Sequence, residues 1–198
     1  TALAAELDAL RDRVLADIGQ RDADYIRNIH KAVRYTGLAG RALLMAGIFP
    51  PAWLAGTALL GVSKILDNME LGHNVMHGQF DWMRDPAFNG KTFEWDIVGT
   101  SDNWRYTHNF RHHTYTNVRG MDDDVGYGLL RLFPEQRWKP MYLAQPVYSV
   151  LFALLFQWGV AIQNLELGRV AKGKKSWAEL KEQWLPLQKK IRSQLLKD

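Results

Sequence analysis

The sequence predicts an all-α fold, an integral-membrane helical bundle, and three observations carry this prediction. Two apolar stretches flank the adjacent prolines Pro50 and Pro51, and each is near the length needed to cross a bilayer. A third stretch runs for 26 residues without a charge between Lys139 and Glu166. At both ends of the chain, apolar residues recur at spacings of three and four, which is the period of an amphipathic helix.

Residues 1–34 are predicted to form an amphipathic N-terminal arm. Its apolar positions are interleaved with charged residues and are Leu3, Leu7, Leu10, Val14 and Ile18. Residues 35–165 are predicted to form the membrane core. Because two adjacent prolines break a continuous helix, we expect a hairpin there, with one helix over about 33–49 and a second over about 52–71.

The last parts of the chain leave two alternatives open. The apolar segment 142–164 is expected either to cross the bilayer or to lie within its interface and re-enter. Residues 166–198 are predicted to form a basic amphipathic helix, whose apolar positions are Trp177, Leu180, Trp184, Leu187, Ile191 and Leu195. This helix is suited either to an anionic membrane surface or to packing against another domain.

Charge and cysteine content exclude several classes of function. The chain has 198 residues, with 25 Lys and Arg against 21 Asp and Glu, and no cysteine. The excess of positive charge lies in residues 165–198, so we expect no nucleic-acid-binding face across the protein. Without cysteine there are no disulfides, zinc ribbons, iron–sulfur clusters or thiolate nucleophiles. Any metal must therefore be held by histidine, carboxylate, amide or water.

Five of the six histidines fall in two short clusters, which are His73 and His77, and His108, His112 and His113. On an α-helix, residues i and i+4 share a face, so each cluster can present two imidazoles to one point. His113 would lie about 100° around the helix from His112 and could serve a second ion. Asn74 stands where a zinc protease has its catalytic glutamate, which disfavours protease chemistry. The clusters predict a metal site, and the imidazoles suit iron, zinc, copper or nickel.

These clusters resemble the first two histidine boxes of the integral-membrane fatty acid desaturases. The pattern is H-x-x-x-H at 73–77 and H-x-x-x-H-H at 108–113, within the string NWRYTHNFRHHTYTN at 103–117, followed by GMDDD at 120–124. That context is similar to the acyl-CoA and front-end branch of the family and to linoleoyl-CoA desaturase-like proteins. The resemblance covers about residues 35–165.

The resemblance implies a non-haem di-iron centre on the cytoplasmic side of a membrane, which is the plasma membrane if the protein is bacterial. With dioxygen as co-substrate, and a ferredoxin- or cytochrome-type donor with its reductase, it would introduce a double bond into a fatty acyl-CoA or acyl-lipid. The five clustered histidines would be the iron ligands. Candidates for orienting them are Asn74, Asn109, Asp67, Glu70, Asp122 and Asp124, and candidates for binding substrate are Trp104 and Arg105.

This sequence departs from the family pattern in one respect. The family has a third histidine box downstream, and no histidine follows His113. We therefore expect the chain to resemble the N-terminal portion of a desaturase, truncated before that box, and to be inactive by itself. Two alternatives stay open: a membrane alkane or lipid hydroxylase with the same iron chemistry, and a non-catalytic, histidine-rich metal-binding membrane module.

Overall fold

All regular secondary structure among the described residues of this chain is helical. The computed structural model describes residues 1–122, 124–163, 165–171 and 173–197, and these contain no β-strand. The chain divides into two compact units, Thr1–Phe93 and Glu94–Asp198, which are considered separately below. The prediction of an all-α fold is thus confirmed for the described part of the chain.

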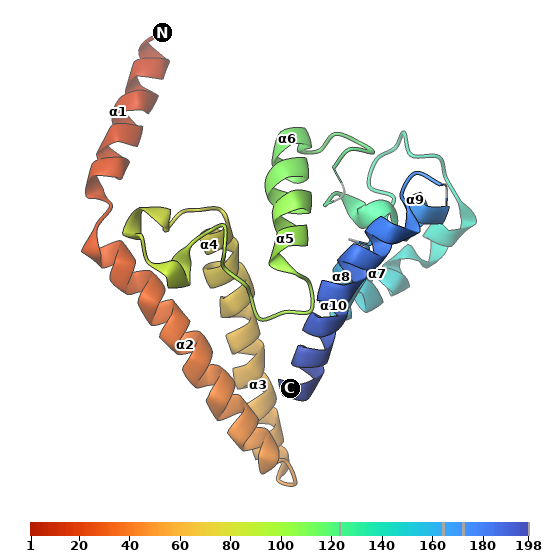
Figure 1. The fold of residues 1–198 in the computed structure, drawn as a ribbon, viewed down its shortest axis with the longest axis horizontal. Coiled ribbons are helices and arrows are strands. Elements are labelled where there is room, and N and C mark those ends of the chain that lie inside the picture. Colours follow the sequence, from red (N-terminus) through yellow and green to blue (C-terminus); the bar gives the residue numbers. More distant parts are fainter. Residues whose placement is uncertain (123, 164, 172, 198) are drawn as a thin grey trace. The chain divides into compact units, whose positions relative to one another are not determined.

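The first unit begins with two helices where one arm was predicted (Figure 1). Helix α1 spans Ala2–Asp17 and helix α2 spans Gln20–Met45. The chain between them is extended at Ile18, and the backbone N–H of Gly19 donates to the Asp22 carboxylate at 2.9 Å, which caps the start of α2. As a result, α2 runs across the boundary predicted at residue 34.

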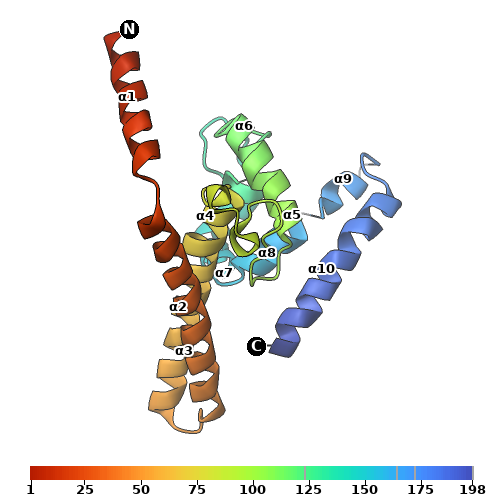
Figure 2. The same cartoon turned by 60° about the vertical axis from the view of Figure 1, so that its left-hand side comes forward.

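Helices α2 and α3 (Pro50–Ile65) form the expected hairpin and lie side by side in both ribbon views (Figure 2). The predicted break at the prolines is confirmed, because proline fits the first turn of a helix at no cost in hydrogen bonds. The helix bounds differ from those predicted: the first helix ends at Met45. The two backbones approach closely, since a Cβ on Gly56 would lie 2.9 Å from the Gly40 carbonyl oxygen.

Helix α3 leads into the first histidine cluster with no loop between them. It passes into a π-helix, η1 (Leu66–Gly72), and then into α4 (His73–Met76). The following loop, with the 3-10 turns η2 (Asp81–Met83) and η3 (Pro86–Phe88), folds back over these segments. The core that results is Ile26, Leu71, Val75, Phe80 and Phe88. Helix α1 contributes no buried residue to it.

The second unit contains one helical rod, followed by several short helices and by the long helix α10. The rod is α5 (Ser101–Trp104), the π-helix η4 (Arg105–His112) and α6 (His113–Tyr115). The other elements are η5 (Gly126–Gly128), η6 (Pro140–Ala144), α7 (Gln145–Leu154), α8 (Phe156–Gln163), α9 (Leu167–Ala171) and α10 (Trp177–Lys197).

The apolar stretch predicted at 142–164 is not one straight helix. It breaks at Leu155, and the segments Pro140–Leu154 and Phe156–Gln163 are bent by 93° relative to each other. Among the described residues, no single helix is both long and apolar enough to cross a membrane. By length and composition, the two segments of this bent pair are sufficient only when they are taken together.

The predicted C-terminal helix is present as α10, and part of its apolar face is used inside the unit. Leu187 is fully buried in a core with Val98, Ala161 and Leu165. In contrast, Trp177 at the start of the helix is 77% exposed. The middle of its apolar face thus packs within its own unit, and both alternatives for this helix, a membrane surface or another domain, stay predictions for the exposed remainder.

Candidate metal centre

The first histidine cluster holds two imidazoles at one point. His73 begins α4 and His77 follows its last residue, and their Nε2 atoms lie 3.2 Å apart. Two nitrogens bound to one metal ion at about 2.1 Å would lie about 3 to 3.4 Å apart, depending on geometry. The distance between the two nitrogens is thus compatible with a shared ion.

A π-helix precedes His73 and sets its position. The backbone N–H of His73 donates to the carbonyl of Asn68, five residues earlier, which is the π-helical bond. Glu70 in this segment accepts a hydrogen bond from the Tyr25 hydroxyl of α2 at 2.5 Å, and the Asn74 amide donates to the Glu70 carbonyl at 2.8 Å. Asp67 is buried in the same segment. The three predicted orienting residues near His73 thus lie on the same continuous helical segment, where the Asn74 amide bonds to the Glu70 backbone and the Glu70 carboxylate to Tyr25.

The second cluster lies on another π-helix, and this changes the expected arrangement. The N–H of His113 donates to the carbonyl of His108, five residues earlier. Because i+4 and i+5 both lie near residue i in a π-helix, the rings of His112 and His113 are almost equally close to His108, at 4.9 and 5.1 Å between centroids. The three imidazoles thus lie close together, and the expectation that His113 could serve a second ion beside the first stays a prediction.

Two carboxylates fix the rings of the second cluster. The Nδ1 atom of His108 lies 2.6 Å from Asp124 Oδ2, and Nδ1 of His112 lies 3.0 Å from both carboxylate oxygens of Asp122. A histidine that binds a metal through Nε2 commonly donates its Nδ1–H to a carboxylate, which fixes the tautomer and makes the ring a better ligand. Asp122 and Asp124, both predicted from the sequence, occupy that place.

The geometry also permits Asp124 to bind a metal directly. One ligand atom each of His108, His112 and Asp124 lies within 4.8 Å of the other two. A donor set of imidazoles and carboxylates suits non-haem iron, whereas thiolate-preferring metals have no ligand in this chain. The residues present therefore fit the iron that the sequence resemblance implies.

Asp122 remains ionised because its hydrogen bonds outweigh its burial. Burial alone would raise the pKa of its carboxyl group. The backbone N–H groups of Asn117 and Asp124 donate to it at 2.8 and 3.0 Å, and with His112 they lower the pKa of Asp122 below its ordinary value. Asn117 reaches this position with a φ of 63°, a left-handed conformation that Asn tolerates better than most residues.

Aromatic rings surround His108. Trp104 stacks on it with 4.4 Å between ring centroids, and Trp95 packs against Trp104 edge to face. Arg105 donates to Asp102 at 2.7 Å.

Tyr127 is a further residue near the carboxylates of the second cluster. Burial raises the pKa of Tyr127 to about 12, with a further contribution from the charges of Asp124 and Asp122. Asn117 and Tyr127 were not predicted from the sequence, and the left-handed φ of Asn117 becomes visible only in the structure.

Comparison with known proteins gives this arrangement a family. A model of the fatty acid desaturase family matches residues 49–190, which include all five clustered histidines. The chain belongs to the fatty acid desaturase family. No solved structure matches this desaturase chain significantly.

Curated relatives with similar sequences are desaturases. The chain is 50% identical over 196 residues to an NADPH-dependent stearoyl-CoA 9-desaturase of Mycobacterium tuberculosis, covering 99% of this chain and 46% of the relative. It is 35% identical over 111 residues to the sn-1 linoleoyl-lipid 6-desaturase of Synechocystis, covering 54% of this chain and 30% of the relative. This desaturase chain thus spans about half the length of the first of these relatives.

Proposed function

We propose that this chain carries two groups of metal-binding histidines of a fatty acyl-CoA desaturase that introduces a double bond into a saturated acyl chain. The single observation that carries the proposal is the pairing of His108 with Asp124 and of His112 with Asp122, in a chain of the desaturase family. The choice of an acyl-CoA substrate is supported by the name of the mycobacterial relative, stearoyl-CoA 9-desaturase. Acyl-lipids, the substrates named for the cyanobacterial relative, are the second choice.

The residues of the chain have distinct roles in this proposal. His73, His77, His108, His112 and His113 hold two irons together with ligands from elsewhere in the protein. When bound, iron with dioxygen and donated electrons supplies the oxidant needed to break unactivated C–H bonds. Asp122 and Asp124 hold the Nδ1 protons of their histidines and keep the metal-binding edges of the rings oriented. Asp67, Glu70, Asn74 and Asn109 remain our proposed residues for orienting the histidine rings.

Stacked aromatic rings exclude water from one face of the second cluster. Trp104 covers the face of His108 and is itself covered by Trp95. A dry environment protects a strong oxidant from side reactions and favours an apolar substrate. Trp104 and Arg105, at the junction of α5 and η4, therefore remain our proposed contacts for the substrate.

The proposed setting is an integral membrane protein with its histidine groups on the cytoplasmic side, reduced by a ferredoxin- or cytochrome-type donor and its reductase. The tip of the α2–α3 hairpin is an argument for contact with a bilayer, because it exposes large apolar side chains. These are Met45, Ile48, Phe49, Trp53 and Leu54. Met45 and Ile48 are 90% and 93% exposed, which is costly in water and favourable in lipid.

Product analysis tests the proposal. The full-length polypeptide containing this chain would be assayed in membranes with stearoyl-CoA, dioxygen, NADPH and a donor system, and iron would be measured by elemental analysis. We expect an unsaturated acyl product from the parent, and loss of both product and iron in a His108→Ala/His112→Ala variant. A His30→Ala variant is the matched control, because His30 lies outside both clusters, and it should retain both.

The two alternatives give different results in the same assay. An alcohol in place of the double bond would identify a hydroxylase. Metal binding without electron-coupled consumption of oxygen would identify a non-catalytic module. Either result would overturn the desaturase proposal.

A further inference from the structure

The bent pair α7–α8 forms an apolar elbow on the second unit, which we define as residues 140–163. No residue of the elbow carries a charge. Its large apolar side chains are widely exposed, with Leu143 and Leu154 at 77% and 76%. The exposed apolar residues of the elbow are Met141, Leu143, Val147, Val150, Leu151, Leu154, Leu155, Phe156 and Ile162. A continuous apolar surface of this kind marks an interaction site.

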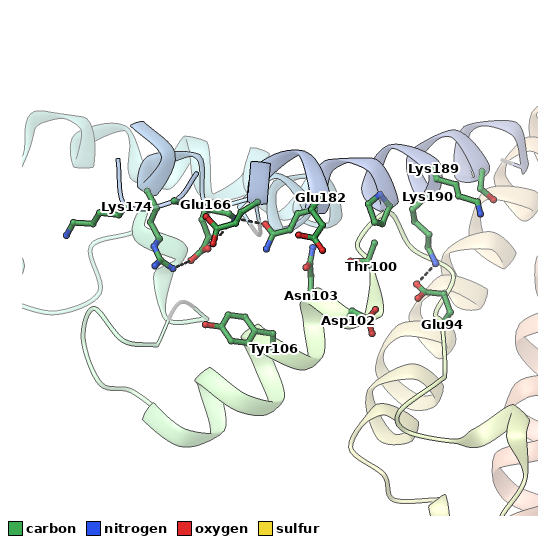
Figure 3. Close-up of a pocket in the computed structure, with 16 residues that line it drawn as sticks. Glu94, Thr100, Asp102, Asn103, Tyr106, Glu166, Lys174, Glu182, Lys189 and Lys190 are labelled. Carbon is green, nitrogen blue, oxygen red and sulfur yellow. Dashed lines mark hydrogen bonds and ion pairs between the residues drawn. The ribbon is translucent and has the colours of Figure 1, made fainter. Parts of the chain in front are cut away.

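The segments before and after the elbow contact each other directly. Lys190 of α10 donates to the Glu94 carboxylate at 2.6 Å (Figure 3). It also donates to the Trp95 carbonyl at 2.5 Å. Four and seven residues further along α10, Gln194 and Lys197 both contact the carboxylate of Asp96. Residues that lie about 45 positions before the elbow thus contact α10, which follows it.

The same two flanks share one apolar core. Val98, before the elbow, packs with Leu187 of α10, and both are almost completely buried. Ala161 of α8 and Leu165 beyond it complete the cluster. One face of α8 is therefore fixed to the body of the unit, while α7 extends from it at the 93° bend.

These contacts constrain the path of the chain at a membrane. Flanks that share ion pairs, hydrogen bonds and a core cannot lie on opposite sides of a bilayer. A chain that enters the apolar phase at Pro140 must accordingly return to the side from which it came. The bend at Leu155 provides the reversal of direction that such a path needs.

The chemistry of the elbow fits lipid better than water or a polar partner. An apolar hollow of about 640 Å³ lies inside the bend, lined mainly by Leu151, Phe152, Leu155, Trp158 and Ile162. Just before the elbow, Arg137, Trp138 and Lys139 are all exposed. Basic and aromatic residues at the border of an apolar segment are typical of the interface with anionic headgroups.

We propose that the α7–α8 elbow inserts into one leaflet of the bilayer and returns to the same side, so that its flanks share one aqueous compartment. Lipid acyl chains cover the exposed face of α7 and fill the hollow of the bend. Arg137 and Lys139 lie at the level of the headgroups. This topology keeps the second histidine cluster and the basic helix α10 on one side of the membrane.

Single cysteine variants in oriented membrane vesicles test this topology. The chain contains no cysteine, so each variant adds the one thiol of these 198 residues. Asp102→Cys lies before the elbow, Leu154→Cys at its exposed face, and Lys181→Cys after it; all three native side chains are exposed. Each variant of the full-length polypeptide would be labelled with a membrane-impermeant maleimide from either side, and its thermal stability compared with that of the parent.

We expect Asp102→Cys and Lys181→Cys to label from the same side, and Leu154→Cys to show no labelling until detergent is added. Labelling of the two flanks from opposite sides would establish a crossing and overturn the proposal. Two further outcomes would also overturn it. Rapid labelling of Leu154→Cys in intact vesicles would mean that the elbow is in water, and disulfide-linked dimers of this variant would mean that a second copy covers it. Because the readout is chemical accessibility, it is independent of desaturase activity.

Discussion

Carboxylates decide how the imidazoles of the second cluster are presented. The Nδ1 atom of His112 meets both oxygens of Asp122, and these oxygens also accept the N–H groups of Asn117 and Asp124. Such a carboxylate cannot rotate away without breaking several hydrogen bonds. The orientation of the His112 ring is therefore fixed by the loop that follows η4 as much as by the π-helix itself.

Replacing Asp122 by Asn should weaken iron binding. The substitution keeps the size of the side chain but removes the negative charge that polarises the His112 ring. Loss of such a partner typically reduces metal affinity by about 10- to 100-fold. The measurement is retention of Fe(II) by the full-length protein against a competing chelator.

The matched control for this substitution is Asp102→Asn. Asp102 lies on α5 of the same helical rod, and its side chain is 92% exposed. This variant should hold iron as the parent does. A loss of iron in both variants would mean that the change in net charge, and not the contact with His112, weakens iron binding. Unchanged iron retention in Asp122→Asn would contradict the role assigned to the carboxylate.

At the scale of elements, neither of the two π-helices could be predicted from the sequence. The spacing of the histidines matches a shared face on an α-helix, and that pattern correctly indicated which rings would meet. The switch to bonds between residues i and i+5, seen at His73 and His113, depends on packing around the helix and leaves no periodicity to detect. The spacing therefore predicted which imidazoles lie close together, whereas the close approach of His113 to His108 depends on the π-helix.

Other elements show why some boundaries were predictable. The start of α3 follows from the proline ring, which is a local property of Pro50 and Pro51. The start of α2 depends on the cap between Gly19 and Asp22, which is a contact that becomes visible only in the fold. The break at Leu155 has no proline or glycine next to it, so an uninterrupted apolar run was the natural reading of that stretch.

The loop over the first histidine pair depends on close backbone contact at Gly90. A Cβ at this position would lie 2.8 Å from the carbonyl oxygen of Val75, a residue of α4, and 3.0 Å from the Cα of Gly78. Both obstacles are backbone atoms, so they cannot move as a side chain would. We expect Gly90→Ala to lower the free energy of unfolding by about 1 to 3 kcal/mol, as overpacking usually does.

Chemical denaturation in detergent measures this difference, and Gly61→Ala is the matched control. Gly61 lies within α3, and a Cβ there would meet nothing within 4 Å. Alanine in an exposed helix stabilises by roughly 0.5 to 1 kcal/mol relative to glycine. We therefore expect the free energy of unfolding to fall in Gly90→Ala and to rise in Gly61→Ala. Equal stability of Gly90→Ala and the parent would show that the loop does not pack on α4 as described.

For the whole molecule, each compact unit contains one histidine group. Thr1–Phe93 holds the pair on α4, and Glu94–Asp198 holds the group on η4 and α6. The residue types and spacings that announce these groups are properties of the sequence, which is why the five histidines and two of the carboxylates could be named in advance. Contacts such as Tyr25 with Glu70 join residues 45 positions apart and become visible only in the fold.

The charge balance of the chain makes it sensitive to acid. With a formal charge of +4 at pH 7 and 25 Lys and Arg, each carboxylate that protonates adds to the repulsion among cations. Glu166, just after the elbow, is the carboxylate best placed to report this. Burial opposes its charge, but hydrogen bonding and the charges of Arg169 and Lys175 overcome that effect, and the pKa of Glu166 is lowered. Its Oε1 atom accepts from Arg169 at 2.8 Å, and its Oε2 atom lies 3.4 Å from the buried ammonium of Lys175.

Replacing Glu166 by Gln should therefore remove part of the acid dependence of stability. A carboxylate whose pKa is lower in the folded state stabilises the fold above its ordinary pKa of 4.5, and this contribution is lost as the pH falls through the lowered value. In denaturant titrations from pH 7 to pH 3, the variant should be less stable than the parent at neutral pH, and the difference should shrink below pH 4.5. Glu6→Gln, at an exposed site on α1, should follow the parent throughout. A constant difference between Glu166→Gln and the parent at every pH would mean that the Arg169 and Lys175 pairings do not stabilise the folded chain through the charge of Glu166.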